Sequence, residues 1–144
     1  MRQEVSTHMS YDFMTVEHRA VCINVVDGDT WDLLVDRGFH DYKLSRFRLI
    51  GYDAYELRRG TPEEREKGRD AKEMCIDWLK PIGVKKVFDI SSWPLRIRTH
   101  KHPGNFGRWL ADLWFKDENG NEIHIGDALV AAGVAVKIVK KKKS

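Results

Sequence analysis

The 144-residue chain has only two cysteines, Cys22 and Cys75, too few for the disulfide framework of a small secreted domain. Cys22 falls within an apolar strand pattern, and Cys75 lies on the apolar stripe of a helical pattern. We therefore expect both residues to be buried free thiols. This use of cysteine fits a reducing, intracellular setting.

Long hydrophobic runs are also missing. No stretch approaches the roughly 20 apolar residues of a membrane span, and the opening residues, MRQEVSTHMS, lack the apolar centre of a signal peptide. We expect a monomer with no membrane partner. The cytoplasm is the default location, although a secreted mature form, from which a signal peptide has been removed, stays open.

Several familiar catalytic motifs are absent as well. The chain has no glycine-rich phosphate loop and no nucleophile elbow. His100, His102 and His124 could be considered as zinc ligands, but no cysteine or acidic partner falls at ligand spacing from them. The chemistry must therefore come from other residue types.

Positive charge is present and unevenly spread. The formal net charge of +3 says little, but Lys137 and the run over residues 140–143 place five lysines among the last eight residues. Such a surface attracts polyanions, and nucleic acid is the partner that we expect. The alternative is a solvated tail that aids solubility.

Alternating apolar residues predict strands over roughly residues 20–26, 30–36, 42–50, 84–90 and 108–115. The capping box of Thr61 to Glu64 begins a long helix that Pro81 and Gly83 close, and a short helix follows over residues 125–132. The apolar run over residues 134–139 should extend against the domain. Five strands with a helix between the third and fourth predict an OB-fold barrel, in the α+β, mainly β class.

The same pattern divides the chain into three parts. Residues 1–17 show no sustained period, and we expect a mobile or loosely packed arm there. Residues 18–139 form the OB-fold domain, and residues 140–144 form a basic tail. No internal repeat or linker interrupts the domain.

Carboxylates gather beside the predicted turns and strand ends. Asp27 and Asp29 flank the glycine of the first hairpin, and Asp53 and Glu56 follow the third strand, which lies next to the second in a meander. Their side chains can therefore converge. Two carboxylates with a backbone carbonyl and water form a hard oxygen site, suited to Ca²⁺ or Mg²⁺ and poorly suited to Zn²⁺. Any one of them alone could simply cap a turn.

Two arginines lie near these acids in the predicted fold. Arg48 occupies the polar face of the third strand, and Arg108 opens the strand that follows the loop containing Pro103. A guanidinium presents a fork of donors that matches two phosphate oxygens and can stabilise charge gained in a transition state. The alternative is a structural pairing with a nearby carboxylate.

The chain resembles the staphylococcal nuclease (thermonuclease-like) family in five segments: VDGDT (26–30), FRLIGYDAYE (47–56), GRDA (68–71), GRWLA (107–111) and ALVAAG (128–133). The resemblance covers about residues 18–136 in order and spacing. It implies a metal-dependent nuclease. Because few residues can be predicted to read base edges, we expect cleavage of DNA, with RNA also open, with little sequence selectivity and with a preference for single strands or frayed duplex.

The resemblance also implies a role for each matching residue. Asp29, Asp53 and the main-chain carbonyl of Ala54 would hold Ca²⁺, with Mg²⁺ less suited, and Asp27 would lie in the outer shell. Glu56 would act as the general base or orient the attacking water. Arg48 and Arg108 would grip the scissile phosphate.

Departures from the family pattern affect the substrate contacts. The family commonly has Thr-Pro where this chain has Ala54-Tyr55, so the loop that carries Glu56 should be less rigid. The family tyrosines after the position of Gly133 are missing, and lysine contacts to phosphate substitute for them. The candidate substrate contacts are Phe106, Leu110, Lys137, Lys140 and Lys141.

A long loop over residues 91–105 is a further candidate for substrate contact. It mixes Trp93 with Arg96, Arg98, His100, Lys101 and His102, which suggests a substrate-contacting flap. Two other readings of the whole chain stay open: an OB-fold nucleic-acid-binding module with a degenerate site, and a structural barrel with decorative surface charge. The presence of the complete acidic and basic set favours the enzyme.

Overall fold

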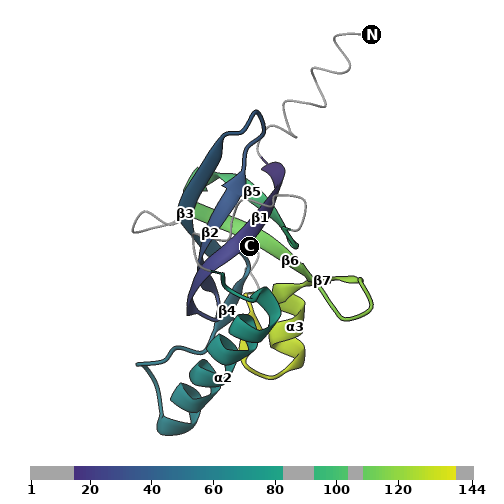
Figure 1. The fold of residues 1–144 in the computed structure, drawn as a ribbon. Coiled ribbons are helices and arrows are strands. Elements are labelled where there is room, and N and C mark those ends of the chain that lie inside the picture. The colour runs from purple at the N-terminus through teal and green to yellow at the C-terminus, as the bar shows by residue number, and fades with distance from the viewer. Residues whose placement is uncertain (1–14, 83–92, 104–108, 139–144) are drawn as a thin grey trace, which may run out of the picture.

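The first part of the fold is a meander of three antiparallel strands. The computed structural model describes residues 15–82, 93–103 and 109–138. In it, β1 (Thr15–Asp27) pairs with β2 (Thr30–Asp36), and β2 pairs with β3 (Tyr42–Leu49) (Figure 1). The predicted meander is confirmed, but β1 begins at Thr15 and not at Ala20. Residues 15–17 therefore belong to the sheet and not to the expected arm, because residues 98–100 of a later strand pair with them.

Two later strands close the sheet into a barrel. β5 (Leu95–Pro103) pairs antiparallel with β1, and β6 (Trp109–Lys116) pairs antiparallel with β5. The strand order is β3-β2-β1-β5-β6, and a parallel pairing of β3 with β6 closes the ring. The fold is thus the expected one: mainly β, with a five-stranded OB-like barrel and two helices.

The position of β5 corrects the sequence-based expectation. The strand expected over residues 84–90 lies outside the described residues, whereas Leu95–Pro103, expected to be part of a substrate flap, forms a barrel strand. Leu95 and Ile97 point into the core, while Arg96 and Arg98 alternate with them on the outside. The flap prediction is wrong for this segment, because the abundance of basic residues obscures a simple inside–outside alternation.

Helix α2 (Pro62–Leu79) lies between the third and fourth strands of the barrel, β3 and β5, as predicted. The Thr61 hydroxyl accepts a hydrogen bond from the Glu64 amide at 3.1 Å, and the Glu64 carboxylate accepts one from the Thr61 amide at 2.9 Å. Ala71, Cys75 and Leu79 form its buried stripe. No helix among the described residues is both long and apolar enough to cross a membrane.

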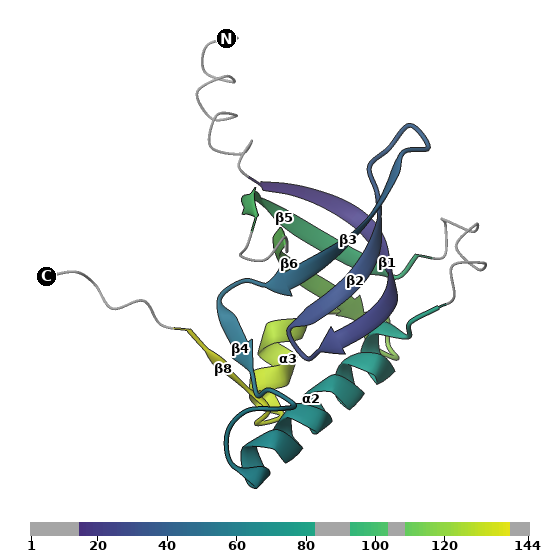
Figure 2. The same cartoon turned by 90° about the vertical axis from the view of Figure 1, so that its left-hand side faces the viewer.

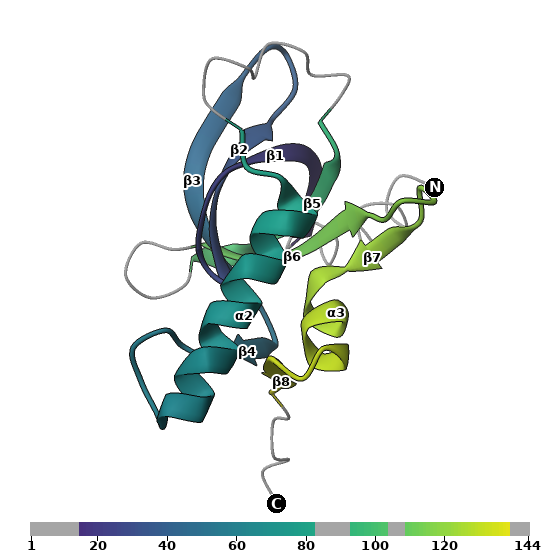
Figure 3. The ribbon, with the colours of Figure 1, turned by 60° about the horizontal axis from the view of Figure 1, so that its bottom comes forward.

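Shorter elements lie at the end of the barrel that α2 covers (Figure 3). They are β4 (Tyr52–Ala54), β7 (Glu122–His124), α3 (Ile125–Ala131) and β8 (Ala135–Lys137). After α3, Gly133 adopts a positive φ of 78°, and the Val134 amide bonds back to the Leu129 carbonyl at 3.1 Å. This turn directs β8 antiparallel to β4 (Figure 2). The extended run expected after Gly133 is therefore confirmed over β8.

The core fills the barrel and the space between it and the helices. Its largest fully buried side chains are Trp31, Leu33, Leu49, Leu79, Leu95, Ile97, Leu113, Ile125 and Leu129. Cys22 and Cys75 are buried free thiols, as expected, and burial raises the pKa of each to about 12. The Cys75 thiol donates to the Gly28 carbonyl at 3.1 Å, which ties α2 to the β1–β2 turn.

Glycine at two positions lets α2 approach the barrel closely. A Cβ atom on Gly28 would lie 2.7 Å from the Ala71 Cβ, and one on Gly68 would lie 2.4 Å from the Glu56 carbonyl oxygen. Real Cβ atoms do not make such contacts. Gly28 therefore permits the hairpin turn to rest on α2, and Gly68 permits the loop after β4 to do the same.

Replacing Gly68 with alanine should destabilise the protein. In an ordinary helix interior this change stabilises by about 0.5–1 kcal/mol, but here overpacking against backbone should cost about 1–3 kcal/mol. The free energy of unfolding, measured in urea, is the test. The control is Asp70→Ala at an exposed position of the same helix, where alanine should be neutral or slightly stabilising. A Gly68→Ala variant more stable than the wild type would contradict the close contact.

Candidate functional site

Asp29 is the most buried acid of the site, with 8% of its surface exposed. Its Oδ1 atom accepts a hydrogen bond from the Thr30 hydroxyl at 3.2 Å, and its Oδ2 atom accepts one from the Ala54 amide at 3.1 Å. Its main-chain carbonyl accepts from the Leu49 amide at 2.8 Å. The residue thus joins the hairpin turn to β3 and β4.

Arg48 lies between two carboxylates. Its Nη2 atom forms an ion pair with Asp53 Oδ1 and lies 3.7 Å from Asp29 Oδ2. Arg48 stands opposite Thr30 in β2 and opposite Leu110 in β6, so the barrel itself sets its position. Asp29 and Asp53, which are distant in sequence, therefore converge on one positively charged nitrogen.

Glu56 lies in the loop that follows β4. Its side chain is about half exposed, with Arg59 Nε 3.4 Å from Glu56 Oε2. The loop itself is restrained on two sides: Gly68 packs under the Glu56 carbonyl, and the Tyr55 amide donates to the Val134 carbonyl at 3.0 Å. A proline at position 55 could not make that hydrogen bond. This hydrogen bond therefore anchors the loop that carries Glu56 through a contact that depends on a residue other than proline at position 55.

Asp27 shares the electrostatic environment of these acids. Burial raises its pKa, and the charges of Asp29 and Glu56 raise it further, against a smaller lowering by Lys72 and Arg58. A carboxyl group whose ionised form is disfavoured by burial and by neighbouring negative charges is typical of functional sites, where groups of like charge lie close together.

Two hollows adjoin Glu56. The first, of about 350 Å³, is lined by Asp53, Ala54, Tyr55, Glu56, Arg59, Gly60, Glu64 and Val136. The second, of about 870 Å³, is lined by Asn24, Val25, Val26, Asp27, Thr30, Arg46, Glu56, Leu57, Arg58, Arg59 and Lys72. Glu56 and Arg59 line both, so the loop after β4 forms the ridge between them.

The structure brings together six of the residues that the sequence proposed for the site: Asp27, Asp29, Arg48, Asp53, Ala54 and Glu56. Leu110 is half-buried beside Arg48. Lys137 of β8 stands opposite Tyr52 of β4. Its neighbour Val136 lines the first hollow, and Lys137 does not. Phe106, Arg108, Lys140 and Lys141 lie outside the described residues.

Sequence reasoning missed several residues that shape the site. Thr30 bonds Asp29, Arg59 faces Glu56, and Val136 forms a wall. Gly68 carried a usable signal, because an isolated glycine inside a helical pattern often marks a close packing contact. The other three give no signal without knowledge of which segments meet.

The donor set has a definite chemistry. Among the described residues no group of three or more His, Cys, Asp or Glu side chains is arranged to hold a metal ion. Asp29 and Asp53 nevertheless present oxygen atoms to the same nitrogen of Arg48, with the Ala54 main chain adjacent. An oxygen-only set of this kind fits a hard cation such as Ca²⁺ and does not fit Zn²⁺.

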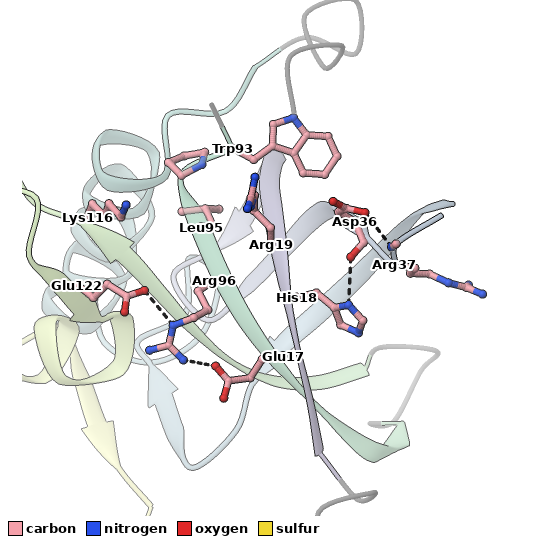
Figure 4. A pocket seen from close by; sticks show the side chains of 12 residues that line it. Glu17, His18, Arg19, Asp36, Arg37, Trp93, Leu95, Arg96, Lys116 and Glu122 are labelled. Carbon is pink, nitrogen blue, oxygen red and sulfur yellow. Dashed lines mark hydrogen bonds and ion pairs between the residues drawn. The ribbon is translucent and has the colours of Figure 1, made fainter. Parts of the chain in front are cut away.

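Residues expected in the flap line a different hollow, of about 550 Å³, on the outside of β1 and β5 (Figure 4). Arg96 forms an ion pair with Glu17 and donates to Glu122 at 2.9 Å. Trp93 is buried, with 6% of its surface exposed. The charge of Arg96 is thus balanced within the protein, and the residue braces β1 against β5 and β7.

Replacing Asp27 with asparagine should stabilise the protein at about pH 7. Because the folded-state pKa of Asp27 is raised, the fold is favoured below the ordinary aspartate pKa of about 3.9 and loses stability as the pH rises through the folded-state value. Asparagine does not ionise, so the variant does not lose this stability as the pH rises. Urea unfolding over a pH series, without divalent cations, should show a gain that shrinks as the pH falls toward about 4. A variant less stable than the wild type at neutral pH would contradict this account.

The sequence matches none of the models of known protein families, and it matches no curated protein.

Proposed function

We propose that this chain is a cation-dependent nuclease of the staphylococcal type, which hydrolyses phosphodiester bonds in DNA. The observation that carries the proposal is the convergence of Asp29 and Asp53 on one guanidinium nitrogen of Arg48, with Glu56 on the adjoining loop. Acids and an arginine gathered around one small volume match the needs of a phosphate centre that gains charge during reaction.

Asp29, Asp53 and the main-chain carbonyl of Ala54 would hold Ca²⁺ in this proposal, with Mg²⁺ less suited. When bound, such a cation polarises a phosphoryl oxygen and neutralises part of its charge. The number of carboxylates supports one cation and not two. The order Ca²⁺ before Mg²⁺ follows from the larger ion's tolerance of irregular oxygen geometry.

Arg48 would bind a non-bridging oxygen of the scissile phosphate. A guanidinium has five N–H donors, so the ion pairs with Asp53 and Asp29 leave others for a ligand. Those carboxylates also hold the guanidinium in place before substrate arrives, which lowers the cost of ordering it. Arg108, expected from the sequence to be the second phosphate-gripping arginine, would supply a further positive charge.

Glu56 would handle the proton of the attacking water. Its carboxylate accepts that proton as the water oxygen bonds to phosphorus, and the bond from phosphorus to the leaving oxygen breaks. The leaving oxygen then takes a proton from solvent. The half-exposed position of Glu56 beside the first hollow leaves space for water, and the anchored loop keeps its main chain in place.

The substrate should be recognised through its backbone. Most of the described residues that line the two hollows are charged or apolar, with Asn24, Thr30 and Tyr55 as the uncharged polar ones, so they offer few uncharged polar groups to read base edges. We therefore propose weak sequence selectivity, with single strands or frayed duplex preferred and RNA as a second substrate.

One observation favours a second function, that of an OB-fold module which binds nucleic acid without cleaving it. Arg48 already neutralises Asp53, and the described residues contain no ready group of three metal-ligating side chains. A site in which the arginine has taken the place of the cation would retain binding and lose hydrolysis.

Plasmid degradation in Ca²⁺ and in excess chelator separates the two functions. The nuclease should degrade plasmid only with the cation. Glu56→Gln should lower kcat by about 10²–10⁴-fold, and Arg48→Lys by about 10²–10³-fold, because each removes a group that acts on the reacting phosphate. The control is Glu66→Gln, at an exposed position of α2, which should keep full activity.

Circular dichroism would show that the variants remain folded. Plasmid left intact by the wild type in Ca²⁺, together with retained binding of labelled single-stranded DNA, would contradict the nuclease and support the binding module. Full activity of folded Arg48→Lys would remove Arg48 from the mechanism.

A further inference from the structure

Several elements contribute residues to the lining of the larger hollow beside Glu56. Val25 and Val26 come from β1, Arg46 from β3, Arg58 from the loop after β4, and Lys72 from α2. Its volume of about 870 Å³ is large enough for a group the size of a nucleotide. None of the catalytic roles proposed above uses its basic residues.

Positive charge predominates in this hollow. Its lining has four cations, Arg46, Arg58, Arg59 and Lys72, against the two acids Asp27 and Glu56. Arg46 donates two hydrogen bonds to Asp32, of 2.8 and 3.1 Å, which restrain its guanidinium.

Arg58 and Lys72 differ from Arg46, because neither makes a hydrogen bond or an ion pair with another residue in the part of the chain that the structure describes. They lie close enough to Asp27 for their charges to lower its pKa, against the effect of its burial. Lys72 is also half-buried. Two cations near a half-buried acid, with their donors left over, are suited to a phosphate group.

Part of the lining of the hollow is apolar. Val25 is buried, and Val26 and Leu57 are half-buried. A lining that combines apolar and basic side chains suits a ligand with both kinds of surface. A nucleotide has both, with a sugar and base beside its phosphate, whereas an inorganic anion has only charge.

Continuity with the first hollow identifies the ligand further. Because Glu56 and Arg59 line both hollows, a chain that crosses the loop after β4 enters both. We propose that the larger hollow is a subsite for the nucleotide next to the scissile phosphate, with Arg58 and Lys72 on its phosphate and Val26 and Leu57 under its sugar and base. The choice of nucleic acid as the ligand rests on the proposed function.

Binding of labelled single-stranded oligothymidylate of about eight nucleotides, a length within the site size of OB folds, tests the subsite. Fluorescence anisotropy in chelator, where cleavage is suppressed, gives Kd over a salt series. The double variant Arg58→Gln/Lys72→Gln should raise Kd at least about tenfold. The slope of log affinity against log salt should become shallower by about 1.4, because each lost phosphate contact on a single strand removes about 0.7.

The matched control removes two lysines elsewhere, as Lys43→Gln/Lys116→Gln. Lys43 lies on the exposed part of β3, and Lys116 lines the hollow outside β1 and β5. The net charge falls equally in both double variants, so a local subsite predicts a clear loss only in the first. Lys72→Arg, which retains the charge, should bind like the wild type.

An unchanged slope in Arg58→Gln/Lys72→Gln, or an equal loss in both double variants, would overturn the subsite. Plasmid cleavage by the wild type in Ca²⁺ decides the proposed function separately. If the wild type cleaves plasmid but Arg58→Gln/Lys72→Gln has the salt slope of the wild type, the nuclease function stands and the subsite is contradicted. If affinity falls only in Arg58→Gln/Lys72→Gln and the wild type does not cleave plasmid, the subsite stands and the proposed nuclease function is contradicted.

Discussion

The arrangement of the site depends on the burial of one carboxylate, that of Asp29. A buried charge costs several kcal/mol unless it is paired and hydrogen-bonded. Here the partners are the Thr30 hydroxyl, the Ala54 amide and the Arg48 guanidinium. Because Thr30 and Arg48 come from adjacent strands and Ala54 from β4, satisfying this carboxylate also aligns the three elements. The residue proposed as a cation ligand is thus equally a structural centre.

Close packing of α2 complements this polar centre. Gly28 and Gly68 have no side chain that would separate the helix from the barrel. The Cys75 thiol donates a hydrogen bond to the β1–β2 turn. The helix thereby supports both the turn that carries Asp27 and Asp29 and the loop that carries Glu56. Charged side chains can then remain next to one another because the backbone that carries them is fixed by contacts elsewhere.

Much of this architecture could be predicted from local patterns. The hairpin at Gly28, the capped helix after Thr61 and the turn at Gly133 each have a short-range cause, and each appears in the structure. The grouping of Asp29 with Arg48 and Asp53 was predictable because strands joined in a meander must be neighbours.

What could not be predicted depends on long-range pairing. The sequence gives no local sign that β5 joins β1, so the segment of Arg96 and Arg98 resembles a basic loop until its partners Glu17 and Glu122 are known. The hydrogen bond from the Tyr55 amide to Val134 likewise joins residues far apart in the chain. The wall formed by Val136 has the same origin.

That wall has a consequence for how the site is assembled. The hollow beside Asp53 is lined by Val136 of β8, at the far end of the described chain. It is also lined by Ala54, whose amide donates to Asp29 at the β1–β2 turn, near the beginning of the described chain. During synthesis on a ribosome the early strands can pair while β8 is still in the exit tunnel. The hollow is therefore completed only after β8 emerges, so a growing chain has no finished hollow before that point.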